Sequence, residues 1–172
     1  MFAPLLIWWG VFYGDNIVTE RHFYFIKDEF YKALPDCYLM ANKGCGAEKG
    51  GRPCHYCFKH DDFYWMVPIS SQVAKYKNIY AEKVKKRGKC DTIKFGYVNG
   101  QERVFLIQNC FPITEKYIDT EYMIQNGTVS VTVSNDLSEE LDKIMRKIIR
   151  MYNNGITLPL TNLKKIIDFL NQ

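Results

Sequence analysis

The sequence lacks an apolar run long enough to cross a bilayer. Its apolar start, residues 1–13, is followed at once by Asp15 and Asn16, whereas a transmembrane helix needs about 20 consecutive apolar residues. The same segment has neither the basic region nor the small-residue cleavage site of a secretory signal. We therefore expect a cytoplasmic protein without a membrane partner.

The sequence also lacks the cysteine pattern of a disulfide or zinc protein. It has 6 cysteines, but without a secretory signal they do not indicate a disulfide framework. Cys54 and Cys57 form one Cys-x-x-Cys pair, and no second pair follows. A strand through this segment would put the two thiols on opposite faces, unlike the tight turn of a zinc knuckle. We expect buried, reduced cysteines, no metal site and no cofactor.

Internal repeats and interdomain linkers are absent as well. A chain of 172 residues suits one compact domain with a real core, which we assign to residues 21–172. Residues 1–20 are apolar without a clear period, and we assign them to an N-terminal extension. Such a segment arises from a start codon assigned too far upstream, or it packs against the core; we favour the first interpretation.

The net charge is small but unevenly distributed. The whole chain carries +4, while residues 71–90 alone carry +6 and the remainder sums to −2. A localised positive segment on a near-neutral body is typical of a surface that binds a polyanion. A solvated, lysine-rich helix face is the alternative interpretation.

Apolar periodicity predicts an α+β domain. Strands are expected at residues 22–27, 53–58, 63–69, 92–98, 102–109 and 128–134. A short helix is expected within 27–39, stopped before Pro35, and further helices at 71–88, 136–154 and 161–171, with a short turn of helix from Thr114. The tetrad Lys59-His60-Asp61-Asp62 is expected to join two of these strands as a hairpin loop, and Asn99-Gly100 favours a tight hairpin turn. This order of elements predicts a mostly antiparallel sheet. We expect helix caps at Ser70 or Ser71, at Asp136 or Ser138, and at Thr161.

One segment concentrates groups that bind phosphate. Arg52 follows a glycine-rich loop, and Ser70 and Ser71 stand where a strand passes into a helix. Helix N-termini attract anions, and arginine matches a phosphate with two exposed oxygens. Lys75, about one turn into the helix, can lean back to the same point. The alternative is that a serine only caps the helix and Arg52 is a surface residue.

Five segments carry a resemblance to a known family: "FYFIKDEFY", "RPCHYCF", "FYWMVPISSQVAKYK", "KCDTIKFGYV" and "VFLIQNCFPITEKYI". The sequence resembles the ToxN/AbiQ endoribonuclease toxins of type III toxin–antitoxin systems, and within them the CptN branch most closely. The resemblance runs from about Phe23 to the C-terminus, and in the final helices it rests on placement more than on residue identity.

The resemblance implies a twisted, mostly antiparallel sheet flanked by helices, with a Kid/MazF-like architecture. It implies cleavage of single-stranded RNA without metal, leaving a 2′,3′-cyclic phosphate and a 5′-hydroxyl. It further implies a role in phage defence and inhibition by a repeated antitoxin RNA pseudoknot, which the toxin also cuts from its precursor. Toxin and RNA are expected to form a closed assembly.

Three residues of the expected site match the family's pattern. Arg52 falls where the family places a basic residue, and Ser70 and Ser71 fall on its Thr/Ser-Ser pair. The family often continues with Pro-Lys, whereas residues 72–75 here read Gln-Val-Ala-Lys. Lys75 is our choice for the displaced basic residue, and Lys77 is the alternative.

Cleavage by a 2′-hydroxyl needs a held phosphate, stabilised negative charge and proton transfer. We expect Arg52 and Ser71 to hold the phosphate and Lys75 to stabilise charge or move a proton. His55 is a candidate general acid or base because of its intrinsic pKa. In an alternating strand, however, His55 points away from Arg52, and a partly buried polar role is the alternative.

Further residues are candidates for RNA contacts. Lysines and an arginine supply charge, an aromatic ring can stack on a base, and side-chain amides can read a base edge or satisfy nearby backbone groups. These candidates are Lys43, Lys49, Tyr64, Lys77, Lys83, Lys85, Lys86, Arg87, Lys89, Gln108 and Asn109. The alternative function is a non-catalytic RNA-binding module that uses the basic helix at residues 75–89.

Overall fold

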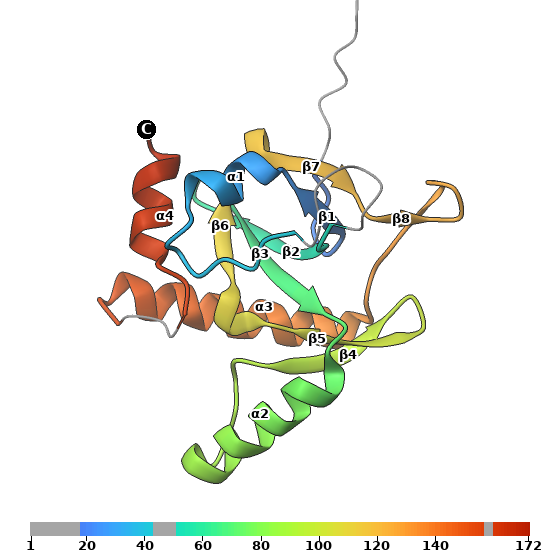
Figure 1. The fold of residues 1–172 in the computed structure, drawn as a ribbon, viewed down its shortest axis with the longest axis vertical. Coiled ribbons are helices and arrows are strands. Elements are labelled where there is room, and N and C mark those ends of the chain that lie inside the picture. Colours follow the sequence, from blue (N-terminus) through green and yellow to red (C-terminus); the bar gives the residue numbers. More distant parts are fainter. Residues whose placement is uncertain (1–17, 43–50, 157–159) are drawn as a thin grey trace, which may run out of the picture.

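The computed structural model describes residues 18–42, 51–156 and 160–172 (Figure 1). Most of the expected N-terminal extension, together with Lys43, Lys49 and Cys45, therefore lies outside the described residues. The described part contains four α-helices: α1 (Asp28–Ala33), α2 (Val73–Arg87), α3 (Asn135–Asn153) and α4 (Leu163–Leu170). Its strands are β1 (Phe23–Ile26), β2 (Cys54–His60), β3 (Phe63–Ser70), β4 (Lys94–Val98), β5 (Gln101–Phe105), β6 (Phe111–Ile113), β7 (Ile118–Glu121), β8 (Met123–Ile124) and β9 (Val129–Ser130).

The main sheet is antiparallel and runs in the order β4-β5-β3-β2-β1-β7. Strand β3 lies at its centre and has two partners along one edge. Its first half pairs with β6, and its end pairs with β5, where Ile69 faces Phe105 and Ser70 faces Val104. The end of β3 is thus held between β2 and β5, which fixes the backbone that leads into α2.

Helices cover both faces of the sheet (Figure 1). Helix α3 packs on one face, where Leu141 and Met145 meet strand residues such as Phe23 and Val67. Helices α1 and α4 pack on the other face. Helix α2 covers the outer side of the β4–β5 hairpin through Val73, Tyr76, Ile79 and Val84, which share a core cluster with hairpin residues such as Val104. The predicted α+β class with a mostly antiparallel, helix-flanked sheet is confirmed.

Both predicted hairpins form. Asn99 and Gly100 have φ of 48° and 71°, the left-handed values that a tight hairpin turn needs. The β2–β3 hairpin is longer than expected, because its strands pair as far as His60 and Phe63 and leave Asp61 and Asp62 as the turn.

Two predicted strands are wrong in extent. The strand expected at residues 102–109 ends at Phe105, and a short 3-10 turn, Ile107–Asn109, follows. The apolar pattern of the sequence continues past the strand because Leu106 and Ile107, at the start of this turn, are buried. Of the strand expected at 128–134, only Val129 and Ser130 pair, in a small hairpin with β8.

The predicted helix caps are also wrong. Helix α3 is capped by Ser134, whose Oγ accepts the N–H of Leu137 at 3.4 Å, and α4 by Asn162, whose Oδ1 accepts the N–H of Lys165 at 3.1 Å. Thr161 instead donates its hydroxyl to the carbonyl of Cys110 at 2.8 Å. Each cap is a short polar residue of the predicted type, displaced along the chain by one or a few positions.

The five described cysteines are free and buried. Cys54 belongs to the core on the α1 and α4 face and Cys57 to the core on the α3 face, as alternation along a strand requires. Burial raises the pKa of Cys54 and of Cys110 to about 12, so both stay protonated thiols. No helix among the described residues is long and apolar enough to span a membrane.

Candidate active site

A cavity of about 340 Å³ opens at the end of the sheet where β1, β2, β3 and the β4–β5 hairpin meet. Its lining includes three of the predicted site residues, Arg52, Ser70 and Ser71. Further lining side chains come from β1, the hairpin and the segment after β7: Phe25, Val98, Asn99, Gln101, Arg103 and Tyr122. Residues far apart in the sequence therefore converge on one pocket.

Arg52 is fixed at both its backbone and its side chain. Its backbone N–H donates to Oδ1 of Asn42 at 2.9 Å, and Nη1 donates to the carbonyl of Ile69 at 2.9 Å. The guanidinium thus bridges the start of β2 and the end of β3. Its Nε is buried and has no hydrogen-bond partner among the described residues. A guanidinium held in this way is preorganised for a phosphate.

Ser70 and Ser71 occupy the passage from β3 into α2. Ser70 is the last residue of β3, and its Oγ accepts the N–H of Gln72 at 3.2 Å. Helix α2 begins at Val73, and its N-cap residue, Gln72, makes no side-chain capping bond. The predicted hydroxyl cap is therefore wrong. Ser71 is exposed, so its hydroxyl is open to a ligand in the pocket.

The pocket is positively charged. Its lining, over the part of the chain that the structure describes, contains Arg52 and Arg103 and no acidic residue. Arg103 donates from Nη1 to the carbonyl of Glu102 at 3.2 Å and from Nη2 to Oε1 of Gln101. Two oriented guanidinium groups near two hydroxyls form an arrangement that binds phosphate and stabilises added negative charge.

Sequence reasoning did not identify Arg103. The alternation along β5 could have pointed to Arg103, because alternate residues of a strand lie on the same face. Gln101 and Arg103 lie on the same face as Phe105, which is fully buried in the α3-side core. The antiparallel order of β3 and β5, which aligns this face with the end of β3, is not visible in the sequence alone.

His55 lies beneath the pocket and not in its lining. It is fully buried, and its ring centroid is 5.0 Å from that of Phe23 and 5.9 Å from that of Phe105. Neither ring nitrogen has a partner among the described residues, and burial lowers the pKa of His55 to about 3. The imidazole is therefore neutral near pH 7, and the structure does not bring it to a bound phosphate.

Lys75 is the other predicted catalytic residue that does not line the pocket. It is exposed in the first turn of α2, and its Nζ lies 5.7 Å from the ring centroid of Tyr76. Lys77, the alternative, forms an ion pair with Glu102 at 3.0 Å on the outer side of the hairpin. Of the two, only Lys75 is without an acidic partner among the ion pairs of the described residues.

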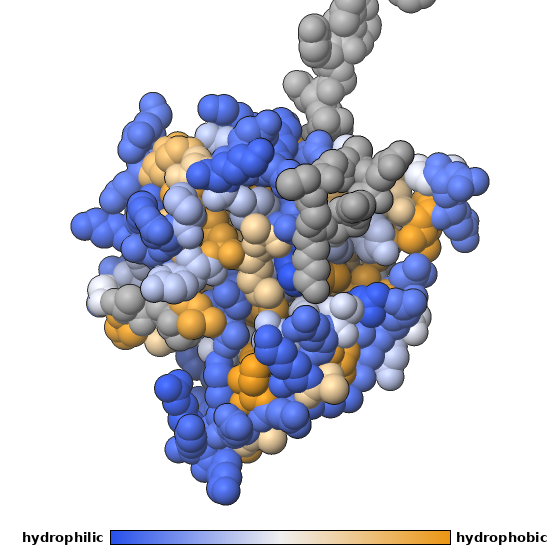
Figure 2. Space-filling view, viewed as in Figure 1, coloured by the Kyte–Doolittle hydropathy of each residue, from blue (hydrophilic) through white to orange (hydrophobic). Residues whose placement is uncertain are grey.

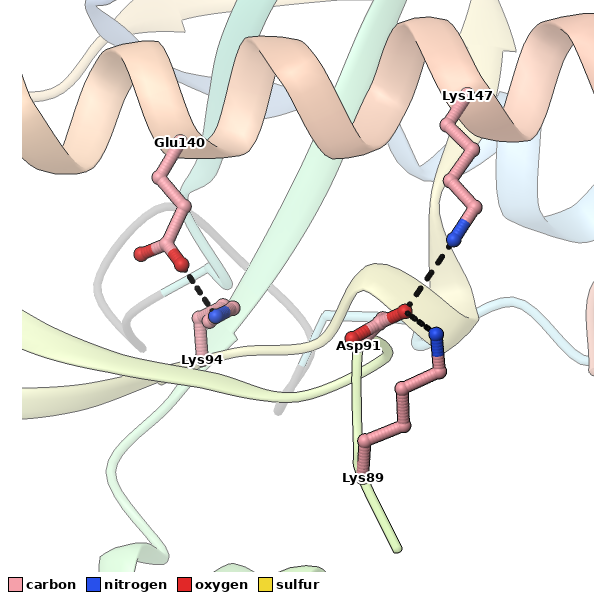
Figure 3. Close-up of polar contacts among 5 residues, drawn as sticks. All are labelled: Lys89, Asp91, Lys94, Glu140 and Lys147. Carbon is pink, nitrogen blue, oxygen red and sulfur yellow. Dashed lines mark hydrogen bonds and ion pairs between the residues drawn. The ribbon is translucent and has the colours of Figure 1, made fainter. Parts of the chain in front are cut away.

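The basic residues toward the end of α2 are mostly on the surface. Lys85, Lys86 and Arg87 are exposed in its last turn, and this end of the molecule is strongly hydrophilic (Figure 2). Lys89 shares Asp91 with Lys147 of α3, at 3.5 and 3.4 Å (Figure 3).

Four other RNA-binding candidates make internal contacts. Lys83 donates to both Thr92 and Gln108, so Gln108 is engaged by a lysine. Asn109 is buried, and its amide donates to the carbonyl of Tyr38 at 3.3 Å. Gln108 and Asn109 therefore satisfy neighbouring polar groups. Tyr64, on the face opposite α3, packs its ring against that of Tyr56 in a tilted arrangement, with ring centroids 5.3 Å apart.

The described residues contain no group of three or more His, Cys, Asp or Glu arranged to hold a metal ion.

Neither a protein-family model nor a curated protein sequence matches the chain. Several solved structures are similar in fold, among them the following two. One is ToxN, from a bacterial antiviral system regulated by a processed non-coding RNA, with a TM-score of 0.63, 9% identity, and coverage of 87% of this chain and 97% of that one. The other is AbiQ, a lactococcal anti-phage endoribonuclease of a type III toxin–antitoxin system, with a TM-score of 0.62, 10% identity, and coverage of 89% and 97%.

The chain thus shares the fold of the type III toxin–antitoxin endoribonucleases ToxN and AbiQ along nearly the whole length of each. The predicted Kid/MazF-like architecture agrees with this likeness. At such low identity the comparison shows the fold alone, and any assignment of chemistry has to come from the residues of the pocket.

Proposed function

We propose that the chain is an endoribonuclease toxin of a type III toxin–antitoxin system, which cuts single-stranded RNA in the pocket of Arg52, Ser70 and Ser71. The observation that carries this proposal is the convergence of these residues with Arg103 in a cavity whose described lining has no acidic residue. The shared fold with ToxN and AbiQ supports the same class of protein.

The proposed reaction is metal-independent transesterification by the neighbouring 2′-hydroxyl. The 2′-hydroxyl gives up its proton to solvent as its oxygen forms a bond to phosphorus, the bond from phosphorus to the 5′-oxygen breaks, and the 5′-oxygen takes a proton from Lys75 or from solvent. Arg52 and Arg103 would stabilise the charge that builds up on the non-bridging oxygens, and the hydroxyls of Ser70 and Ser71 would orient them. The products are a 2′,3′-cyclic phosphate and a 5′-hydroxyl end.

Lys75 completes the proposed site as a mobile cation. Its stem is flexible, and its contact with the neighbouring Tyr76 ring is weak at an exposed position. Rotation toward the start of α2 would bring the ammonium group to the phosphate held near Ser71. There it would stabilise charge or move a proton to the leaving 5′-oxygen.

The proposed partner is an antitoxin RNA built from repeats, which the toxin cuts from its precursor and which then inhibits it in a closed protein–RNA assembly. The ToxN system is regulated by a processed non-coding RNA, which supports this partner. The exposed basic turn of Lys85, Lys86 and Arg87 offers phosphate contacts away from the pocket. We place the protein in the CptN branch, in the cytoplasm and in phage defence.

Growth of bacteria that express the chain tests the proposed activity. The unaltered protein is expected to stop growth, and Arg52→Ala and Ser71→Ala are expected to restore it while the purified variants stay folded. Arg150→Ala and Ser130→Ala serve as matched controls, because neither residue lines the pocket. Undiminished toxicity of both pocket variants would place the site elsewhere.

The DNA upstream of the reading frame tests the proposed partner. We expect a short tandem repeat followed by a transcription terminator, since the antitoxin is proposed to be a repeated RNA. A gene with no such repeat beside it would contradict the antitoxin part of the proposal.

A further inference from the structure

The pocket extends beyond the groups that would hold a phosphate. Arg52, Ser70 and Ser71 account for one side, but the cavity of about 340 Å³ also has a wall of aromatic rings and a wall of amides. A phosphate needs neither. Aromatic and amide groups together are what proteins use to hold an unpaired base.

The aromatic wall is formed by Phe25 and Tyr122. Their ring centroids are 5.6 Å apart with an interplanar angle of 70°, and both side chains are partly exposed. Tyr122 is fixed by its backbone, which donates to the carbonyl of Phe23 at 2.7 Å and accepts the N–H of Val131 at 3.2 Å. A fixed, partly exposed ring in a cationic pocket suits a stacked base.

The amide wall comes from the β4–β5 hairpin. The Oε1 atom of Gln101 accepts a bond from Arg103, and no bond from its amide N–H groups is found among the described residues, so two donors remain for a ligand in the pocket that Gln101 lines. Asn99 stands in the rigid turn with φ of 48°. With Arg103 beside them, these side chains offer mainly donors. Guanine, with adjacent N7 and O6 acceptors, is the base that matches a set of donors best.

We infer that this half of the pocket is a specificity subsite for the base next to the scissile phosphate. The base stacks against Tyr122 and Phe25, and Gln101 and Asn99 read its acceptor edge, so that guanine is preferred. The inference rests on the proposed function for its ligand, single-stranded RNA.

Binding of uncleavable RNA tests the inference without requiring activity. The probes are fluorescent hexauridylates with 2′-O-methyl riboses, in which one uracil is kept or replaced by guanine, adenine or cytosine. We expect the guanine probe to bind roughly tenfold more tightly than the all-uracil probe, since paired contacts to a base edge discriminate by about this factor. Equal affinity for the four probes would overturn the inference.

Variants assign the preference to its residues. Gln101→Ala is expected to remove the guanine preference, and so is Asn99→Gly, which keeps the left-handed turn unstrained. Tyr97→Ala is the matched control, because Tyr97 is exposed on the same hairpin outside the pocket. A preference that survives both amide variants, or that Tyr97→Ala also removes, would overturn the inference.

The tyrosine separates stacking from a merely structural role. Tyr122→Leu is expected to weaken binding of every probe roughly tenfold, while Tyr122→Phe retains the ring and the affinity. Cleavage of the matching unmodified RNAs is scored separately. Base-selective binding without cleavage would contradict the proposed function alone, and cleavage without base selection would contradict the subsite alone.

Discussion

At the scale of single residues, the site depends on how a few polar groups are held. Arg52 could be selected from the sequence as a candidate phosphate ligand because a glycine-rich loop precedes it and a strand follows. The bond from Nη1 to the Ile69 carbonyl could not, since it depends on the pairing of β2 with β3. His55 is a residue whose type pointed to a role that the fold does not support. Its residue type suggested catalysis, but alternation along β2 turns its ring into the core.

The buried His55 predicts a dependence of stability on pH. The unfolded chain binds a proton at His55 near pH 6.5, whereas the folded chain binds it only near pH 3. Between these values the unfolded state holds more protons, so stability falls as the pH falls. Compared with His55→Leu, the unaltered protein is expected to lose about 3 kcal/mol of unfolding free energy between pH 7 and pH 4. Urea unfolding at several pH values measures this difference, and parallel profiles for the two proteins would refute it.

The two candidate lysines make different predictions. Lys75→Ala is expected to lower the rate of RNA cleavage at saturating RNA by roughly a hundredfold to a thousandfold, as loss of one charge-stabilising group does. Lys77→Ala is expected to leave that rate nearly unchanged, because Lys77 pairs with Glu102 on the outer side of the hairpin. Single-turnover kinetics compare the two. A larger effect from Lys77→Ala would reverse the assignment.

At the scale of elements, local signals predicted the hairpins and helices, and long-range pairing decided the rest. Asn99-Gly100 specified its turn directly. The strand predicted to end at Asn109 ends at Phe105. The prediction was too long because the residues after Phe105 are apolar and buried, and an apolar pattern alone does not show whether a buried residue pairs in a sheet. The sequence also did not predict that β5 and β6 would share one edge of β3. The pairing of β5 with the end of β3 brings Arg103 and Ser70 into the lining of the same pocket.

Gly96 marks a close approach of α3 to β4. A Cβ atom at this position would lie 2.2 Å from Cδ2 of Leu137 and 3.3 Å from the ring of Phe105. Gly96→Ala is therefore expected to reduce the unfolding free energy by about 1–3 kcal/mol. In the double variant with Leu137→Ala, the two losses should be clearly less than additive, because the shorter side chain removes the clash. Additive losses in denaturant titrations would show that the two residues are not in conflict.

At the scale of the whole molecule, the proposed function divides RNA contact between two places. In that proposal the pocket holds the scissile phosphate, and the basic end of α2 holds backbone phosphates elsewhere. The contrast between a +6 segment and a near-neutral remainder could be read from the sequence. The separation of these charges from the reacting group could not, because it follows from α2 lying on the outer side of the hairpin.

Charge removal on α2 should weaken binding without altering the chemistry. The triple variant Lys85→Ala, Lys86→Ala and Arg87→Ala is expected to lower RNA affinity and to reduce the slope of log K against log salt by about 2. The single-turnover rate at saturating RNA is expected to stay the same. An unchanged slope would remove these residues from the interface, and a lower saturating rate would connect them to the pocket.

The central claim is that the pocket of Arg52 and Ser71 cuts RNA by using the RNA's own 2′-hydroxyl. The most direct measurement incubates the purified protein with a single-stranded RNA and EDTA and identifies the ends of the fragments. The account predicts 2′,3′-cyclic phosphate and 5′-hydroxyl ends, lost in Arg52→Ala and Ser71→Ala and lost when the cleaved nucleotide carries a 2′-O-methyl group. Tight RNA binding without fragments, or cleavage that persists at the 2′-O-methyl position, would contradict it.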